Sequence, residues 1–242
     1  MKRNNNRAAN EIRPVNIVSG YMKYAEGSCL IESGDTKVIC TASVDYKVPP
    51  FLKDRNEGWL TAEYSMLPRS AHSRIPRDSS KGKVNGRAQE IQRLIGRSLR
   101  SVINFSYFPG ITLLIDCDVI SADGGTRTAS ITGAYVAAYL AFLKLIRDEK
   151  IEKMPFYDSV AAISIGIANG EILLDLDYSE DSIAELDFNF VLTGSKKIIE
   201  IQGCAEKTPI GFDILEKLYE FSKTAVANIT DLQNKAISHT IY

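Results

Sequence analysis

Residues 123–130, DGGTRTAS, carry the side chains best suited to chemistry in this chain. The two glycines leave the backbone free to bend and to bring main-chain N–H groups close to a bound group. Thr126, Thr128 and Ser130 add hydroxyl donors. Arg127 adds a full positive charge at the expected start of a helix, where the helix dipole also favours anions. We interpret the segment as an anion site, with phosphate as the favoured anion. An ordinary glycine turn with a Ser/Thr cap is the alternative.

The flanking residues place this turn between a strand and a helix. Before it, apolar residues recur at the period of a strand, at Ile111, Leu113, Ile115, Cys117 and Val119. After it, residues 131–146 are apolar on nearly every side, as in a buried helix. We therefore expect the positive end of a core helix to lie beside the bound anion.

A second arginine also indicates an anion. The apolar period predicts a helix over residues 86–103, with Asn85 as its cap. At 100° per residue, Arg87 falls in the apolar arc, one turn before Ile91. An arginine aimed at the core from a helix start needs a buried anionic partner. That partner is either a structural carboxylate or a bound phosphate, and the nearby glycine turn favours phosphate.

Charge is strongly separated along a chain whose formal net charge is only −1. Residues 69–100 have a local charge of +7, from two acids, Asp78 and Glu90, and nine bases, Arg69, Arg74, Arg77, Lys81, Lys83, Arg87, Arg93, Arg97 and Arg100. Such a stretch suits a polyanion, because each neutralised phosphate releases counterions. The alternative is a solvated face that pairs with an acidic stretch elsewhere in the chain.

That acidic stretch, residues 175–187, contains six carboxylates and no base. Asp181 and Asp187 flank a five-residue segment, and Asp175 lies upstream at the end of a predicted hairpin strand. Carboxylates brought together near a phosphate usually hold Mg²⁺ or share a proton. Acids on a solvated turn are an equally good interpretation of the pattern by itself.

Composition limits the other classes of protein. The 242 residues are 45% hydrophobic and 24% charged, as in a soluble globular protein. The longest apolar stretch, residues 133–143, is too short to cross a bilayer, and the basic start is followed by no apolar signal-peptide segment. The four cysteines show no CxxC spacing, so a zinc site and a disulfide framework are both disfavoured. This cysteine pattern fits a protein of the reducing cytoplasm best. Because His72 and His239 are the only histidines, a Ser-His-Asp or Cys-His hydrolase is disfavoured.

Both halves of the chain are predicted to run hairpins first and a helix later. The first half, residues 10–150, contains a hairpin at 27–44, a strand near 59–67, an irregular basic segment at 69–83, and then the helix, strand and turn described above. The second half, residues 155–235, contains hairpins that turn at Asn169-Gly170 and Gly194, then a helix at 213–229. We expect an α+β fold of duplicated β-α-β units that form a single domain over residues 1–242.

Several motifs, in chain order, closely resemble those of the ribonuclease PH family. They are RPV (13–15), AEGS (25–28), GDTKV (34–38), TAEY (61–64), MLPRS (66–70), EIQRLIGR (90–97), DCDV (116–119), ADGGTRTASITG (122–133) and EDS (180–182). The resemblance covers about residues 10–235. It departs at Leu186, where a small polar residue is expected, and in the Asn-rich start, which we expect to precede the fold.

The resemblance implies a phosphorolytic 3′→5′ exoribonuclease. Such an enzyme is a tRNA nucleotidyltransferase that trims the 3′ ends of precursor tRNA and other RNA with inorganic phosphate, and it releases nucleoside diphosphates. The resemblance also implies the β-α-β fold shared with a domain of ribosomal protein S5. The implied assembly is a hexameric ring, a trimer of dimers, in the cytoplasm and without a membrane partner.

The same resemblance assigns roles to residues whose chemistry was described above. Phosphate binding falls to Arg87 and the segment Gly125-Thr126-Arg127. Catalysis and Mg²⁺ binding fall to Asp181 and Asp187. Guidance of the RNA 3′ end falls to Arg69, Arg74 and Arg77.

Two other functions are alternatives to the phosphorolytic exoribonuclease. A catalytically silent ring subunit that only binds RNA would lack the aspartates or Arg127, and all of them are present. A small-molecule kinase with similar architecture would need a phosphate loop suited to ATP, and the sequence contains no G-x-x-x-x-G-K-[ST] run.

Overall fold

The alternating apolar residues of the first half assemble into one mixed sheet. The computed structural model describes residues 3–82 and 85–241, so Lys83 of the basic stretch lies outside the described residues. The first sheet has the order β1-β2-β3-β5-β4 and contains β1 (Val15–Ser19), β2 (Gly27–Ser33), β3 (Thr36–Asp45), β4 (Trp59–Met66) and β5 (Thr112–Ser121). Within it β4 is parallel to β5, and the other neighbours are antiparallel.

The second half forms an antiparallel sheet of its own. Its order is β7-β6-β8-β9, with β6 (Val160–Ala168), β7 (Glu171–Leu174), β8 (Leu186–Thr193) and β9 (Ile198–Ala205). Asn169 and Gly170 both have positive φ at the β6–β7 turn, as an Asn-Gly hairpin requires. The α+β class and the two hairpin-then-helix halves are therefore confirmed.

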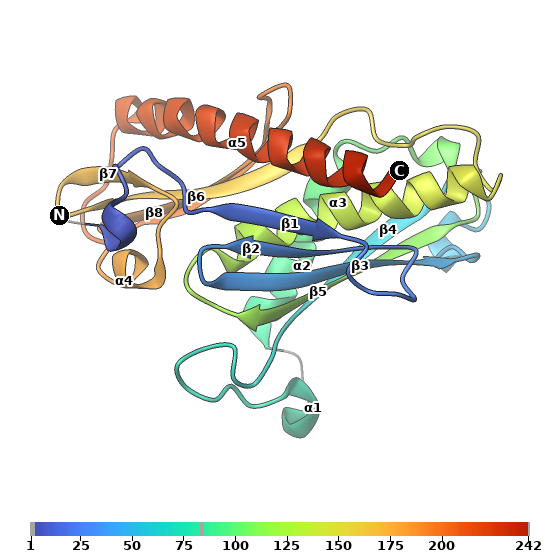
Figure 1. Ribbon diagram of the computed structural model, residues 1–242, viewed down its shortest axis with the longest axis horizontal. Coiled ribbons are helices and arrows are strands. Elements are labelled where there is room, and N and C mark those ends of the chain that lie inside the picture. Colours follow the sequence, from blue (N-terminus) through green and yellow to red (C-terminus); the bar gives the residue numbers. More distant parts are fainter. Residues whose placement is uncertain (1–2, 83–84, 242) are drawn as a thin grey trace.

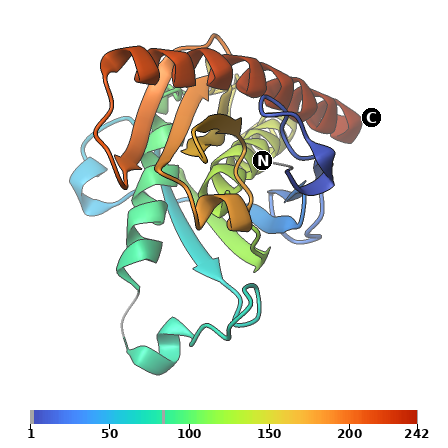
Figure 2. The same ribbon diagram turned by 90° about the vertical axis from the view of Figure 1, so that its left-hand side faces the viewer.

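Helices cover the two sheets (Figures 1 and 2). They are α1 (Asp78–Lys81), α2 (Gly86–Arg100), α3 (Thr126–Arg147), α4 (Tyr178–Asp181) and α5 (Phe212–Ile241); short 3-10 turns lie at Asn4–Asn6, Pro50–Leu52 and Phe105–Tyr107. The helix α3 packs on β2 and β3 and also contacts β6, while α5 covers the second sheet and reaches β1. The loop that carries α1 projects from the body on the side away from α5 (Figures 1 and 2).

The helix α3 forms the centre of the core. It is long and apolar enough to cross a membrane by length and composition alone, but 78% of its most apolar window is buried inside the protein. Alternate residues of β3, at Val38, Cys40 and Ala42, are fully buried in the same core cluster. The helix α3 is therefore a buried core helix.

Several predicted boundaries were wrong. The core helix begins at Thr126 rather than at residue 131, because the glycine turn itself opens it. The terminal helix continues to Ile241 rather than ending near residue 229, since its last turns pack beside β1 and Ser19 Oγ donates to the Ala236 carbonyl over 2.8 Å. The strand β1 was not predicted; it has only five residues and half-buried alternation.

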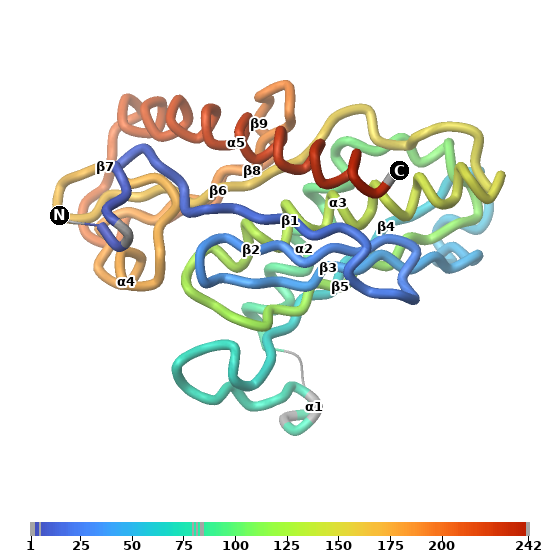
Figure 3. Tube along the Cα trace, in the orientation of Figure 1, coloured from blue at the N-terminus to red at the C-terminus, as the bar shows by residue number. Residues whose placement is uncertain are grey.

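The expectation that the Asn-rich start precedes the fold was also wrong. The N-terminal segment lies beside α4 and β7, far from the last turns of α5 (Figure 3). Its backbone joins the second half directly, because the Leu174 amide donates to the Ala9 carbonyl over 2.8 Å. Arg3 and Arg7 are both buried.

The contact between α3 and the first sheet leads to a stability prediction. A Cβ at Gly133 would lie 2.7 Å from Cys40 Sγ and 2.9 Å from Ile31 Cγ2. Gly133→Ala should therefore overpack the core and cost about 1–3 kcal/mol. Gly86→Ala is the control, because a Cβ there meets nothing within 4 Å. We expect a lower urea midpoint for Gly133→Ala only, at fixed protein concentration; equal midpoints in both variants would contradict the close packing.

Candidate active site

One cavity of about 360 Å³ collects most of the predicted site residues. It lies where the anion turn (residues 123–125) meets the start of α2, the single turn of α4 and the beginning of β8. Its lining includes Arg87, Gly124, Gly125, Thr126, Arg127, Asp181, Asp187 and Asn189, together with Ala71, His72 and Ser73 from the loop before α1. Residues from both halves of the chain therefore line the same cavity.

The anion turn presents backbone rather than side chain to this cavity. Gly124 and Gly125 have φ of +73° and +66°, a region that favours glycine. The helix α3 begins directly afterwards at Thr126, and no side chain caps its Gly125 N-cap. The first N–H groups of a helix have no acceptor inside it. With no cap from the described residues, these N–H groups and the dipole behind them favour an anion.

The hydroxyl groups of the turn behave differently from the prediction. Thr128 Oγ1 donates to the Gly125 carbonyl and Ser130 Oγ to the Thr126 carbonyl, both over 2.8 Å. These two hydroxyls therefore bond back to their own helix and are not free donors for an anion. Thr126 Oγ1 lies 3.0 Å from the Tyr64 hydroxyl, and it alone of the three lines the cavity.

Arg127 is held in place from the second half of the chain. Its Nη1 donates to Gln202 Oε1 on β9 over 2.8 Å, and Gln202 Nε2 in turn donates to Glu90 of α2. This chain of contacts joins α3, β9 and α2. It orients the guanidinium without neutralising it, because the direct partner is an uncharged amide.

Arg87 lies in the cavity but does not point into the core. Its side chain is exposed, and the prediction of a buried arginine with a buried partner was wrong. The cause is the position of the first turn of α2, which lies at the rim of the cavity, so that its inward face meets solvent. The Asn85 cap was confirmed: its side chain accepts from the Arg87 amide over 3.0 Å.

Asp181 and Asp187 lie in the same cavity from neighbouring elements. Asp181 is the last residue of α4, and Asp187 is near the start of β8. Neither carboxylate accepts a hydrogen bond from a described residue. Burial and the neighbouring charge of Asp181, only partly opposed by Arg127 and Arg87, raise the pKa of Asp187 to about 6. Desolvation by the surrounding protein also raises the pKa of Asp181, although that side chain is exposed at the rim.

Arg69, Arg74 and Arg77 are exposed in the loop between β4 and α1, and they do not line the main cavity. Their neighbours Ala71, His72 and Ser73 do. Arg77 lines an adjoining cavity together with Arg87. The three arginines are therefore placed beside the site, on the projecting loop, rather than within it.

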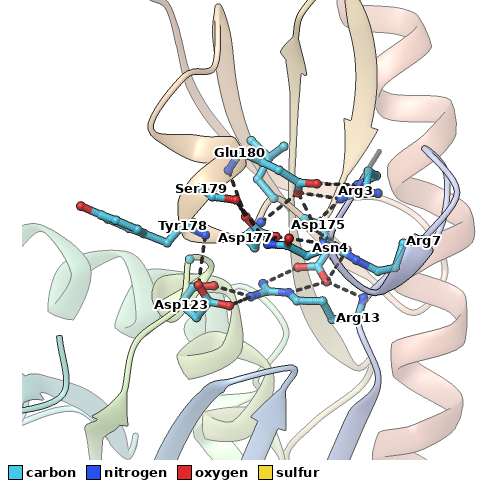
Figure 4. A network of polar contacts seen from close by, with 12 residues as sticks. Arg3, Asn4, Arg7, Arg13, Asp123, Asp175, Asp177, Tyr178, Ser179 and Glu180 are labelled. Carbon is cyan, nitrogen blue, oxygen red and sulfur yellow. Dashed lines mark hydrogen bonds and ion pairs between the residues drawn. The ribbon is translucent and has the colours of Figure 1, made fainter. Parts of the chain in front are cut away.

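Part of the acidic stretch pairs with three arginines to which the sequence pattern assigned no role. Figure 4 shows Asp175, Asp177 and Glu180 gathered with Arg3, Arg7 and Arg13. The alternative in which the acids pair with residues 69–100 is thus wrong for these three carboxylates. Asp175 belongs to this buried network and not to the cavity: its Oδ1 accepts from Arg13 Nη2 over 2.6 Å.

Some residues in or beside the cavity were missed. Asn189 follows Asp187 by two positions in β8, so strand alternation places both on one face, and this signal was present in the sequence. Gln202 opposes Asn189 across the β8–β9 pairing, which requires the register of the sheet. His72 and Tyr178 line the cavity with ring centroids 5.6 Å apart, a meeting of distant segments that no local pattern indicates.

The raised pKa of Asp187 leads to a pH prediction. A folded-state pKa of about 6, against an ordinary value of 3.8, destabilises the folded protein above pH 6, and this penalty disappears as the pH falls toward 4. Without added metal, Asp187→Asn should therefore be more stable than the parent at pH 7.5 by about 1–2 kcal/mol, allowing for screening in an open cavity.

The advantage should shrink to nothing near pH 4, as followed by urea unfolding across this range. Asp54→Asn, at an exposed carboxylate outside the cavity, is the control and should show no such trend. A stability difference between Asp187→Asn and the parent that does not change with pH would contradict the raised pKa.

Comparison with known proteins identifies the family of the chain. The model of the 3′ exoribonuclease family, domain 1, matches residues 11–143, and that of domain 2 matches residues 158–225. Proteins named ribonuclease PH from Neisseria meningitidis (serogroup C) and Neisseria gonorrhoeae are each 53% identical over 232 residues, which is 96% of this chain and 96% of theirs.

Solved structures agree on the fold. Rice Rrp46 superposes with a TM-score of 0.78 at 16% identity, over 97% of this chain and all of the other. A chain of the Archaeoglobus fulgidus exosome, solved with RNA bound to the active site, gives a TM-score of 0.79 at 19% identity, over 95% and 92%. From its sequence relatives and both family models, the chain belongs to the ribonuclease PH family.

Proposed function

We propose that the cavity is where this chain carries out the ribonuclease PH reaction. The chain is a phosphorolytic tRNA nucleotidyltransferase, an exoribonuclease with inorganic phosphate as co-substrate. A phosphate oxygen attacks the phosphorus of the last phosphodiester, the bond to the 3′ oxygen of the preceding nucleotide breaks, and that oxygen takes up a proton. The products are a nucleoside diphosphate and an RNA one nucleotide shorter, and the reverse reaction extends RNA.

The observation that carries the proposal is the uncapped start of α3, which shares one cavity with the side chains of Arg87 and Arg127. The attacking phosphate and the scissile phosphodiester are both negative, and two unit charges about 4 Å apart repel by roughly 4 kcal/mol at an effective dielectric of 20. Arg87, Arg127 and the N–H groups that follow Gly125 offset this repulsion. We assign them, with Thr126, to holding the nucleophile in line with the bond that breaks.

The two aspartates would hold Mg²⁺. Neither carboxylate has a hydrogen-bond donor among the described residues. Burial, and then repulsion from Asp181, raises the pKa of Asp187, so a cation would relieve an electrostatic cost. No group of three or more His, Cys, Asp or Glu side chains suited to a metal occurs in the described residues. Two carboxylates still fit Mg²⁺, which commonly uses one or two together with waters and substrate phosphates. Bound there, Mg²⁺ would supply charge stabilisation at the scissile group.

The proposal extends to the substrate and the assembly. RNA is the substrate, and family members are oligomeric. We propose that Arg69, Arg74 and Arg77 guide the RNA 3′ strand of precursor tRNA toward the cavity, and that the chain assembles as a hexamer of three dimers in the cytoplasm. We further propose that residues 10–150 and 155–235 work as one domain, because the cavity takes groups from both.

The first functional prediction concerns phosphate. Arg127→Ala removes a charge-assisted contact worth about 1.5–3 kcal/mol, so the KM for phosphate should rise about 10- to 100-fold while RNA affinity changes little. Arg93→Ala, at an exposed arginine of α2 outside the cavity, is the matched control and should leave the KM unchanged. Lost RNA affinity with a normal phosphate KM would refute the assignment.

The second functional prediction concerns the basic loop. Neutralising Arg69, Arg74 and Arg77 together should weaken binding of precursor tRNA and lower its salt dependence, since each contact on a single strand contributes about −0.7 to the slope of log K against log salt. Loss of three contacts should change the slope by about two. Cleavage of very short RNA should change little. A triple variant with an unchanged salt slope would assign these arginines to folding or subunit contacts instead.

A further inference from the structure

The helix α4 is a single turn, yet it carries Asp181. It spans only Tyr178–Asp181, and so short a helix is not stable without tertiary contacts. A capping box closes it: Glu180 accepts from the Asp177 amide, and the Asp177 side chain accepts from the Glu180 amide, over 3.1 and 3.0 Å. What holds this turn to the rest of the protein therefore decides where Asp181 lies.

Arg3 makes several of the contacts that hold this turn. Its Nε donates to Glu180 Oε1 over 2.7 Å and its Nη2 to Glu180 Oε2 over 2.9 Å, a two-pronged contact. The same Nη2 also reaches the carbonyl oxygens of Leu174 and Asp175, over 2.8 and 3.1 Å. One guanidinium thus ties the end of β7 to the residue just before Asp181.

Neighbouring groups of the N-terminal segment extend this clamp. Arg7 lies 3.4 Å from Glu180 Oε2, and its Nη1 donates to the Asp175 carbonyl over 3.0 Å. Asn4 Nδ2 donates to Asp177 Oδ2 over 2.9 Å. Figure 4 shows these side chains converging on the segment that leads into α4. Arg3 and Glu180 are 5% and 1% exposed, so water cannot substitute for either partner.

We propose that Arg3, supported by Arg7, is a positioning residue for the reaction: through Glu180 it fixes α4 and thereby sets Asp181 in the cavity. The inference rests on the proposed role of Asp181. The clamp acts on the carboxylate side of the cavity. The anion turn touches α4 through Asp123 and Gly124, but Arg127 has a contact of its own with Gln202 on β9 that does not involve Arg3.

Because Arg3 contacts the carboxylate side of the cavity and not the phosphate side, its substitution should change some kinetic parameters and spare others. General unfolding would change all of them. Arg3→Gln in the full-length enzyme should lower kcat at least tenfold and raise the Mg²⁺ concentration for half-maximal activity at least fivefold. The KM for phosphate should stay within twofold, because Arg87 and Arg127 are untouched. Excess Mg²⁺ should restore part of the lost rate, and Arg3→Lys, which keeps the charge, should fall between the parent and Arg3→Gln.

The controls separate this inference from the function on which it rests. Lys144→Gln breaks a surface pair with Asp148, remote from the cavity lining, and should leave all parameters unchanged. Activity in Asp181→Asn equal to that of the parent would overturn the role of Asp181 itself. Inactive Asp181→Asn with parental kcat and Mg²⁺ dependence in Arg3→Gln would overturn the positioning role alone.

A proportional rise in the phosphate KM of Arg3→Gln would also overturn the proposal, since it would indicate general loosening of the site. Circular dichroism and thermal melting establish that each variant is folded at the assay temperature. If Arg3→Gln does not fold, Glu180→Gln takes its place: it keeps the shape of the side chain, removes the charge that Arg3 grips, and is expected to give the same pattern.

Discussion

The close contact between the anion turn and α4 is the constraint on which the rest of the structure depends. A Cβ at Gly124 would lie 2.7 Å from the Leu176 carbonyl oxygen and 3.0 Å from the Tyr178 nitrogen, so only a glycine lets the two segments touch. Arg13 bridges the same junction, because it grips the Asp175 carboxylate and also donates to the Asp123 carbonyl. The anion turn of the first half and the two aspartates of the second half can therefore face one cavity.

Charge is distributed differently on the two sides of this junction. In the buried network of Figure 4, arginine and carboxylate side chains form ion pairs with one another. Removing one partner of a buried ion pair typically lowers the free energy of unfolding by about 3–5 kcal/mol. Burial opposes the charge of Arg13, but its hydrogen bonds and its attraction to Asp175 raise the pKa of that side chain. In the cavity, Arg87, Asp181 and Asp187 lack such partners among the described residues. Paired charges thus lie beside a cavity whose own charged side chains, as far as the structure describes them, are unpaired.

Patterns of neighbouring residues in the sequence predicted the turns and caps of the fold correctly. They failed for contacts between segments that are far apart in the sequence. The Asn-Gly hairpin, the Asn85 cap and the glycine turn follow from the conformations that those few residues allow. The depth of Arg87 was predicted wrongly, because helical period says which way a side chain points but not where the core ends. Arg3 and Arg7 were overlooked for a related reason: their partners are more than 160 residues away, and an Asn-rich start has no period of its own.

The claim that inorganic phosphate is the attacking group is tested most directly by the identity of the released nucleotide. RNA incubated with the enzyme and ³²P-labelled phosphate should yield nucleoside diphosphates that carry the label in their terminal phosphate, and shortening should stop when phosphate is left out. Unlabelled nucleoside monophosphates, released at the same rate without phosphate, would show hydrolysis and would contradict the account.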